Sequence, residues 1–247
     1  MCDEVEWLAG SEFGPAGVVL ARGISPEELA RRAGGTPGTA VELTGEEAER
    51  IIAQTHAIGS NVLRVGVCGD WAYGVEHLTD YANEDASLRA SQGGGEAINY
   101  RPMAWHPPDR FAYLRDGRLV CAFGMREEAD RYGDDPDHLV PVLVAGGVLT
   151  PDGKSYPART PGMARDDSRR TLRVLAQHFG ICMPRESMME ASLPAYVIRG
   201  TLNLGPDPDY DVIRTWAAAQ GYDVNWGSRS GHVPAQIREA FSKAAGI

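Results

Sequence analysis

The clearest pattern of apolar and polar positions lies near the end of the chain. Apolar residues recur there every three or four positions in two separate segments, which is the spacing of one face of an α-helix. Gly221 stands where the first helix would end in a left-handed residue, and Pro234 stands where the second would begin. The pattern predicts a helix–loop–helix module with two stripes: Val212, Ile213, Trp216, Ala217 and Gln220, then Ile237, Ala240, Phe241 and Ala244.

Residues 111–123 contain the clearest strand pattern. Apolar and aromatic residues stand at alternate positions on both sides of Asp116-Gly117, a pair that favours the tight turn of a β-hairpin. The sequence therefore predicts a hairpin here. Four more segments have the apolar character of strands: 16–23, 61–68, 71–76 and 97–101.

Helix-start signals stand between these strands. Ser25 precedes Pro26 and lies three residues before Glu28, which is the spacing of a capping box, and Thr44 with Glu47 repeats it. These elements predict an α+β fold, an antiparallel sheet with flanking helices on one face. Helices are expected at 25–34, 44–55, 80–90, 135–146 and 167–179, and from residue 184 onward.

The chain is expected to contain two domains. An α+β domain of residues 1–200 would be followed by the helix–loop–helix module of residues 201–247, and Gly205-Pro206-Asp207-Pro208-Asp209 has the composition of a hinge. Residues from Leu193 onward are interpreted as the connection that leads out of the first domain. Residues 150–167, rich in Pro, Gly and Ser/Thr, are interpreted as a long loop.

Charge and composition narrow the possible partners and compartment. The 247 residues carry a formal net charge of −10, which argues against a protein whose whole surface binds nucleic acid. No apolar run is long enough to span a membrane, and the N-terminus is acidic. The sequence therefore predicts a cytoplasmic protein without a membrane partner. The cysteines stand singly, which favours neither a disulfide framework nor a zinc site: Cys2, Cys68, Cys121 and Cys182.

No known catalytic motif appears in the chain, so we expect a protein that is not an enzyme and that binds no cofactor or metal. Asp134, Asp135 and Asp137 are interpreted as a solvated loop and helix start rather than a cation site. Arg165, Arg169 and Arg173 repeat at helical spacing, and we favour pairing with acidic neighbours over a phosphate contact. The histidines are mostly solitary: His56, His77, His106, His138, His178 and His232.

The terminal stretch resembles the DNA-binding domain of Lsr-type actinobacterial nucleoid-associated proteins. The resemblance rests on Ile213-Arg214-x-Trp216-Ala217, Gly221-Tyr222-x-Val224, Gly231-x-Val233-Pro234-Ala235-x-Ile237 and Ala240-Phe241. It implies two helices that hold a loop against the minor groove of AT-rich DNA, where the narrow groove concentrates negative potential.

The loop departs from the family at its centre. The family has Arg-Gly-Arg where this chain has Ser230-Gly231-His232, and Arg229 stands one residue earlier. Residues 206–247 carry five acids and four bases, a net charge of −1. The resemblance therefore implies DNA contact through Arg229, Ser230, Gly231, His232 and Arg214, weakened by the missing arginines. The loop also resembles the glycine-rich loop of peripheral subunit-binding domains of 2-oxoacid dehydrogenase complexes, which implies a protein partner instead.

The larger part of the chain resembles an uncharacterised actinobacterial domain of unknown function, which brings no chemistry with it. The function expected from the sequence is a non-enzymatic, DNA-associated protein whose first domain binds a ligand or partner. The alternative is an interaction or immunity-type protein whose terminal module docks a protein. The matching segments of the larger part are Arg22–Glu28, Trp71–Glu76, Phe111–Gly117 and Gly133–Leu139.

Overall fold

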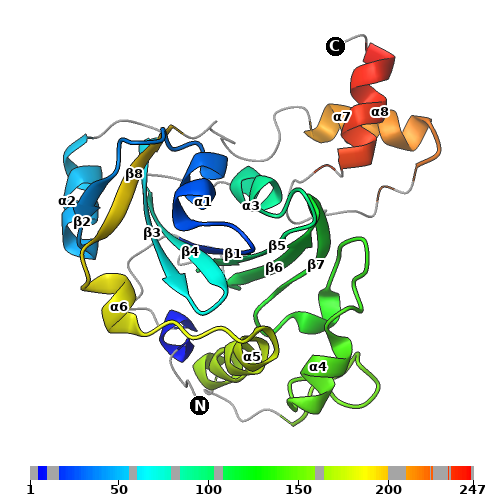
Figure 1. Cartoon of the computed structure of the whole chain (residues 1–247). Coiled ribbons are helices and arrows are strands. Elements are labelled where there is room, and N and C mark those ends of the chain that lie inside the picture. Colours follow the sequence, from blue (N-terminus) through cyan, green and yellow to red (C-terminus); the bar gives the residue numbers. More distant parts are fainter. Residues whose placement is uncertain are drawn as a thin grey trace. The chain divides into compact units, whose positions relative to one another are not determined.

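The chain divides into two compact units in a computed structural model, and each is described by itself (Figure 1). The first unit is Met1–Gly200 and the second is Thr201–Ile247. The structure describes residues 5–9, 17–55, 60–78, 84–102, 108–158, 164–199, 210–222, 224, 233 and 235–245.

The first unit is built on one eight-stranded sheet. Its strands have the order β2-β8-β3-β4-β1-β5-β6-β7, and each neighbouring pair is antiparallel. The predicted α+β class and antiparallel sheet are confirmed. The strands are β1 (Gly17–Arg22), β2 (Val41–Leu43), β3 (Ser60–Cys68), β4 (Trp71–Leu78), β5 (Glu96–Arg101), β6 (Arg110–Arg115), β7 (Arg118–Gly124) and β8 (Leu193–Arg199).

Helices cover both faces of this sheet, so the expectation of helices on one face is wrong. Strand β1 shows why, because Val18 and Leu20 enter one apolar core while Val19 and Ala21 enter the other. The first core contains residues of η1 (Glu6–Ala9), α4 (Val140–Ala145) and α5 (Ala164–Phe179). The second contains residues of α1 (Pro26–Ala33) and α3 (Glu84–Ala90). The remaining elements of this unit are α2 (Gly45–Thr55), η2 (Glu128–Asp130) and α6 (Arg185–Met189).

Local signals fixed several helix and turn positions. The Ser25 hydroxyl accepts a hydrogen bond from the Glu28 amide at 3.1 Å, although the Glu28 side chain turns to Arg31 instead of completing a capping box. Thr44 and Glu47 form the reciprocal pair.

The predicted hairpin is present between β6 and β7. Asp116 and Gly117 have φ values of 49° and 73°, and positive values at both positions define the type I′ turn. The start of one helix differs from expectation. Helix α4 begins at Val140 rather than near Asp135, because residues before it form turns that pair with β7.

Strand β8 is the largest departure from the sequence-based picture. The segment expected to lead out of the domain lies between β2 and β3, with Leu63 opposite Tyr196. Its partners are far away in the sequence, so no local pattern reveals the pairing. The short strand β2 was also missed, since its three residues are mainly exposed.

The cysteines differ from the expected pattern at one position. Cys182 is disulfide-bonded, whereas Cys68 and Cys121 are free and buried. The Cys182 amide donates to Cys68 Sγ at 3.1 Å, so this thiol lies against the chain that carries the bonded cysteine. The sequence did not favour a disulfide, and this prediction is wrong at Cys182, because spacing along a sequence does not report distance in the fold.

Gly133 provides a test of the packing against β7. Its φ is 132°, and a Cβ atom built there would lie 2.4 Å from the Val120 carbonyl oxygen. We expect Gly133→Ala to lower the free energy of unfolding by about 2–4 kcal/mol, measured by urea denaturation. Gly147→Ala is the matched control: φ is 68° and the space is open, so about 1 kcal/mol is expected. Equal losses in both variants would contradict this account.

Candidate functional site

The second unit is a pair of short helices with its own apolar core. Helix α7 (Tyr210–Ala219) packs against α8 (Ala235–Ala245). The two predicted helices are thus present, although Val212, Gln220 and Ala244 are exposed and do not belong to the buried stripes. The core consists of Ile213, Ala217, Val233 and Ile237, with Trp216, Val224 and Phe241 packed around it.

The end of α7 is fixed by a left-handed glycine, as predicted. Gly221 has a φ of 80°, and the Tyr222 amide donates to the Ala217 carbonyl oxygen at 3.0 Å. This places the Tyr222 ring on Trp216, with ring centroids 5.8 Å apart. Trp216 also meets Phe241 edge-on at 5.4 Å, so one indole joins both helices and the residue after the first.

The residues predicted to contact DNA fall mainly in the connection between these helices. Arg229, Ser230, Gly231 and His232 lie outside the described residues, as does Pro234. Arg214 is described and lies half-buried on α7, next to the core residue Ile213.

In the first unit, one row of paired residues crosses the end of the sheet. Residues directly opposite each other on antiparallel strands point to the same face, so charges placed in one row interact. The register produces such a row in strand order from β3 to β7: Cys68, Trp71, Arg22, Glu96, Arg115 and Arg118.

Glu96 is the centre of this row. Its carboxylate accepts hydrogen bonds from Arg22 Nη1 at 2.8 Å, the Tyr113 hydroxyl at 2.9 Å and Arg115 Nη2 at 3.1 Å. Burial acts to raise the pKa of Glu96, but Tyr113 and the two arginines outweigh it and lower the pKa. Burial and then Glu96 raise the pKa of Tyr113, which keeps the phenol protonated. The Glu96 carboxylate thus accepts hydrogen bonds from all three donors. The row lies at the end of the apolar core.

Two imidazoles lie beside the row. The His138 ring stacks on Tyr113 with centroids 5.4 Å apart, and its Nδ1 lies 3.2 Å from the Asp135 carboxylate. His178 meets Phe179 edge-on at 4.7 Å, and burial followed by the proximity of His138 lowers its pKa. Within the part of the chain that the structure describes, no three His, Cys, Asp or Glu side chains gather in a metal-binding group.

The adjacent pair Glu76-His77 lies within the sheet. His77 Nε2 is 3.4 Å from Nη1 of the fully buried Arg64. Since a guanidinium can only donate, Nε2 accepts and the proton stands on Nδ1. Burial and then Arg64 lower the pKa of His77 to about 4. Arg64 also donates to the carbonyl oxygens of Leu43 and Ala191, at 2.9 and 2.8 Å, so this pair secures β2 and the segment before β8.

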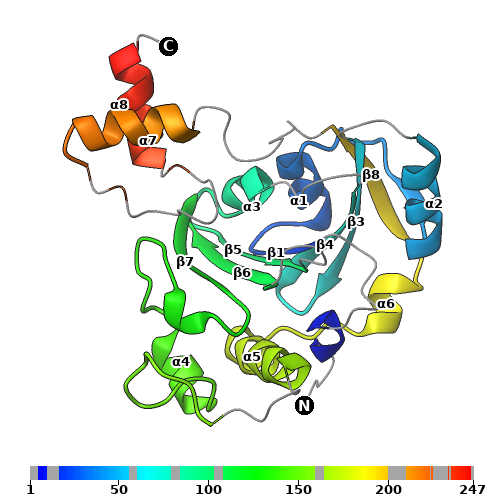
Figure 2. The ribbon, with the colours of Figure 1, turned by 180° about the vertical axis from the view of Figure 1, so that it is seen from behind.

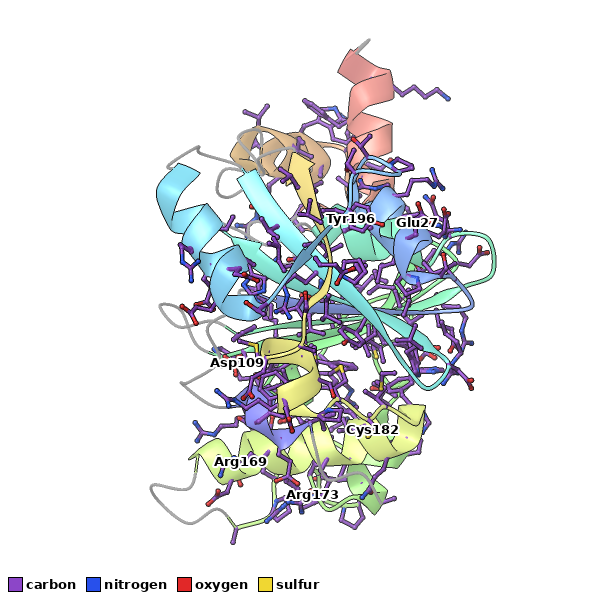
Figure 3. All side chains as sticks on the ribbon, turned by 60° about the vertical axis from the view of Figure 1, so that its left-hand side comes forward. Glu27, Asp109, Arg169, Arg173, Cys182 and Tyr196 are labelled. Carbon is purple, nitrogen blue, oxygen red and sulfur yellow. The ribbon has the colours of Figure 1, made fainter. Side chains whose placement is uncertain are left out.

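The arginines of α5 are paired with acids, as favoured from the sequence. Arg173 Nε lies 2.5 Å from Glu6, and Arg169 Nη1 lies 3.8 Å from Asp166. Figure 3 shows Arg169 and Arg173 on this one helix. The Arg165 side chain lies outside the described residues. A phosphate contact therefore gains no support from Arg169 and Arg173, whose charges are offset.

A family comparison fits the first unit. The model of a family of unknown function, DUF6461, matches residues 13–192. The chain belongs to this family. The match confirms the expected uncharacterised domain and stops before the second unit, whose resemblance to Lsr-type proteins stays a prediction. No curated protein and no solved structure matches the chain.

In this DUF6461 member, residues from the segments that matched an uncharacterised domain in the sequence analysis have structural roles. Trp71 Nε1 donates to the Phe179 carbonyl oxygen, and Tyr113 holds Glu96. Asp116-Gly117 forms the hairpin turn, and Gly133 fits against Val120. Sequence reasoning missed the row around Glu96, because Arg22 and Glu96 are 74 residues apart and meet only through the register of β1 and β5.

The low pKa of His77 predicts an acid-dependent loss of stability. The unfolded chain binds this proton near pH 6.5 and the folded chain only near pH 4. Stability present above pH 6.5 is therefore lost as the pH falls toward 4, by about 3 kcal/mol for this residue.

We expect the His77→Gln variant to lack this part of the decline, measured by urea denaturation at pH 7, 5.5 and 4. The Val67→Gln variant replaces an exposed side chain of β3 that does not titrate, so it serves as the control, with an unchanged slope. A His77→Gln slope equal to that of the original chain would show that His77 binds its proton at the same pH in the folded and the unfolded chain, against this account.

Proposed function

We propose that this chain is a non-enzymatic, DNA-associated protein that contacts AT-rich DNA through its second unit, while the first unit binds a ligand or partner. The observation that carries the proposal is that Val224 and Val233 pack on one small core. The two residues on either side of segment 225–232 therefore belong to the same two-helix base. A fixed base lowers the entropy that a short DNA-contacting segment loses on binding.

The chemistry of residues 225–232 supports DNA rather than another polymer. Arg229 and His232 supply a guanidinium and an imidazole, separated by Gly231, which places no Cβ against a groove floor. A narrow A·T minor groove has the negative potential that attracts such cations. The resemblance to Lsr-type domains adds to this argument on the same residues.

The charge balance predicts a weak and salt-sensitive contact. Residues 206–247 have a net charge of −1 within a chain of −10, so no broad positive field assists the association. Binding would depend on a few direct contacts, each worth about 1 kcal/mol, and added salt would weaken it.

A second candidate function is docking of a protein partner by the same unit. Val212 and Tyr222 are 57% and 43% exposed, so their apolar surface is available to a protein partner. Binding of this kind would depend little on salt, which separates it from the DNA proposal.

The DNA proposal predicts that Arg229→Ala weakens binding to an AT-rich duplex about fivefold, the effect of one lost contact. Fluorescence anisotropy of the full chain, with AT-rich and GC-rich duplexes at 50 and 200 mM salt, measures it. Arg50→Ala, an exposed arginine of α2 paired with Glu46, is the control and should bind as the original chain does. Absence of salt-sensitive binding to either duplex would refute the proposal.

A further inference from the structure

A hollow rich in arginine lies between the ends of α1 and α3. Both helices lie side by side on one face of the sheet, as Figures 1 and 2 show from opposite sides. The hollow is open to solvent and has a volume of about 420 Å³. Its lining consists of Arg31, Arg32, Gly34, Arg89, Gln92 and Gly93.

Arg32 of α1 and Arg89 of α3 each donate hydrogen bonds to the end of the other helix. Arg32 Nη1 donates to the carbonyl oxygens of Arg89, Ala90 and Gln92 at 3.0, 3.2 and 2.9 Å. Arg89 Nε donates to the Arg32 carbonyl oxygen at 2.5 Å. The final carbonyl groups of a helix need such donors, so each guanidinium caps the neighbouring helix. Both side chains are therefore fixed before any ligand arrives.

The hydrogen bonds of these three arginines leave four of their nine guanidinium nitrogens unused. Among the described residues, no hydrogen bond is formed by Arg32 Nη2 or by either terminal nitrogen of Arg89. Arg31 uses Nε and Nη2 on Glu28 and keeps Nη1. Four terminal nitrogens of these three arginines are thus available to a ligand. The planar guanidinium group presents its N–H donors in a geometry that matches phosphate oxygens.

Two glycines, Gly34 and Gly93, belong to the lining of the hollow, and the space beside Gly93 is open to a ligand. Gly93 has a φ of 77°, and a Cβ atom built on it would meet nothing within 4 Å. The loop that carries it is held by the hairpin turn, since the Gly94 amide donates to Asp116 Oδ1 at 2.9 Å and the Gly117 amide to Ser91 Oγ at 3.0 Å. The backbone beside Gly93 is therefore held in position by the hairpin turn.

The local charge is positive although the whole chain is acidic. Three guanidinium groups face one carboxylate, Glu28, which accepts from both Arg31 and Arg32. The ends of the two helices oppose this with about one half of an elementary charge each. About one net positive charge remains, which suits an anion with several oxygens and predicts modest affinity.

We propose that this hollow binds a phosphate-bearing anion through Arg31, Arg32 and Arg89. The inference does not rest on DNA contact by the second unit. The phosphate belongs either to a free phosphate compound or to the backbone of a nucleic acid, and the test separates the two.

The test is isothermal titration calorimetry of the full chain with inorganic pyrophosphate, at 50 and 300 mM salt. We expect Arg31→Gln and Arg89→Gln each to weaken binding about tenfold, and Glu28→Gln to strengthen it about threefold. Arg31 caps no helix, so its variant tests the site without endangering the fold. Arg50→Gln removes a comparable arginine of an i,i+4 pair on α2 and should change nothing.

The same variants are then measured against the AT-rich duplex. Weakened binding of pyrophosphate with unchanged binding of DNA assigns the hollow to a free phosphate compound. Weakened binding of both assigns it to a nucleic-acid backbone, and the Arg229→Ala variant shows separately whether the second unit contributes. The proposal is wrong if the original chain does not bind pyrophosphate at 10 mM, or if folded Arg31→Gln and Arg89→Gln chains bind it as the original does.

Discussion

The Phe179 carbonyl oxygen is the point at which the longest helix of the first unit joins the sheet. It accepts hydrogen bonds from Arg22 Nη2 at 2.8 Å and from Trp71 Nε1 at 3.0 Å. The Arg22 guanidinium also lies over the Trp71 ring, 4.4 Å from its centroid. These contacts tie the last turn of α5 to the ends of β1 and β4, and the main apolar core depends on that placement.

Several charged side chains in the first unit join separate strands and segments through hydrogen bonds. Glu96 joins three strands through Arg22, Tyr113 and Arg115, and buried Arg64 joins β3 to the backbone at Leu43 and Ala191. Breaking a buried ionic contact is costly even where the intact contact adds little net stability. Arg22 and Tyr113, two of the residues on which the resemblance of the larger part of the chain rests, thus hold elements of the fold together.

Positive charge with unused donors is concentrated locally in a chain of net charge −10. In the first unit it occurs where Arg31, Arg32 and Arg89 meet between two helix ends. Local fields of this kind act over about one Debye length, so an acidic surface elsewhere does not cancel them.

Among the described residues, no helix has the length and apolar character needed to span a bilayer.

The sequence by itself determined the local elements. Helical spacing and Gly221 placed α7, alternation with Asp116-Gly117 placed the β6–β7 hairpin, and Ser25 placed the start of α1. These features depend on residues within one or two turns of each other, so their physical cause is present in a short stretch of sequence.

Only the tertiary structure decided what depends on distant pairing. It placed β8 inside the sheet, put helices on both faces, brought Glu96 to Arg22, and set Arg32 against the end of the helix that carries Arg89. The physical reason is that strand register and helix packing are fixed by burial of surfaces shared between distant segments. A one-residue change of register would turn Glu96 away from Arg22, and no local pattern encodes that choice.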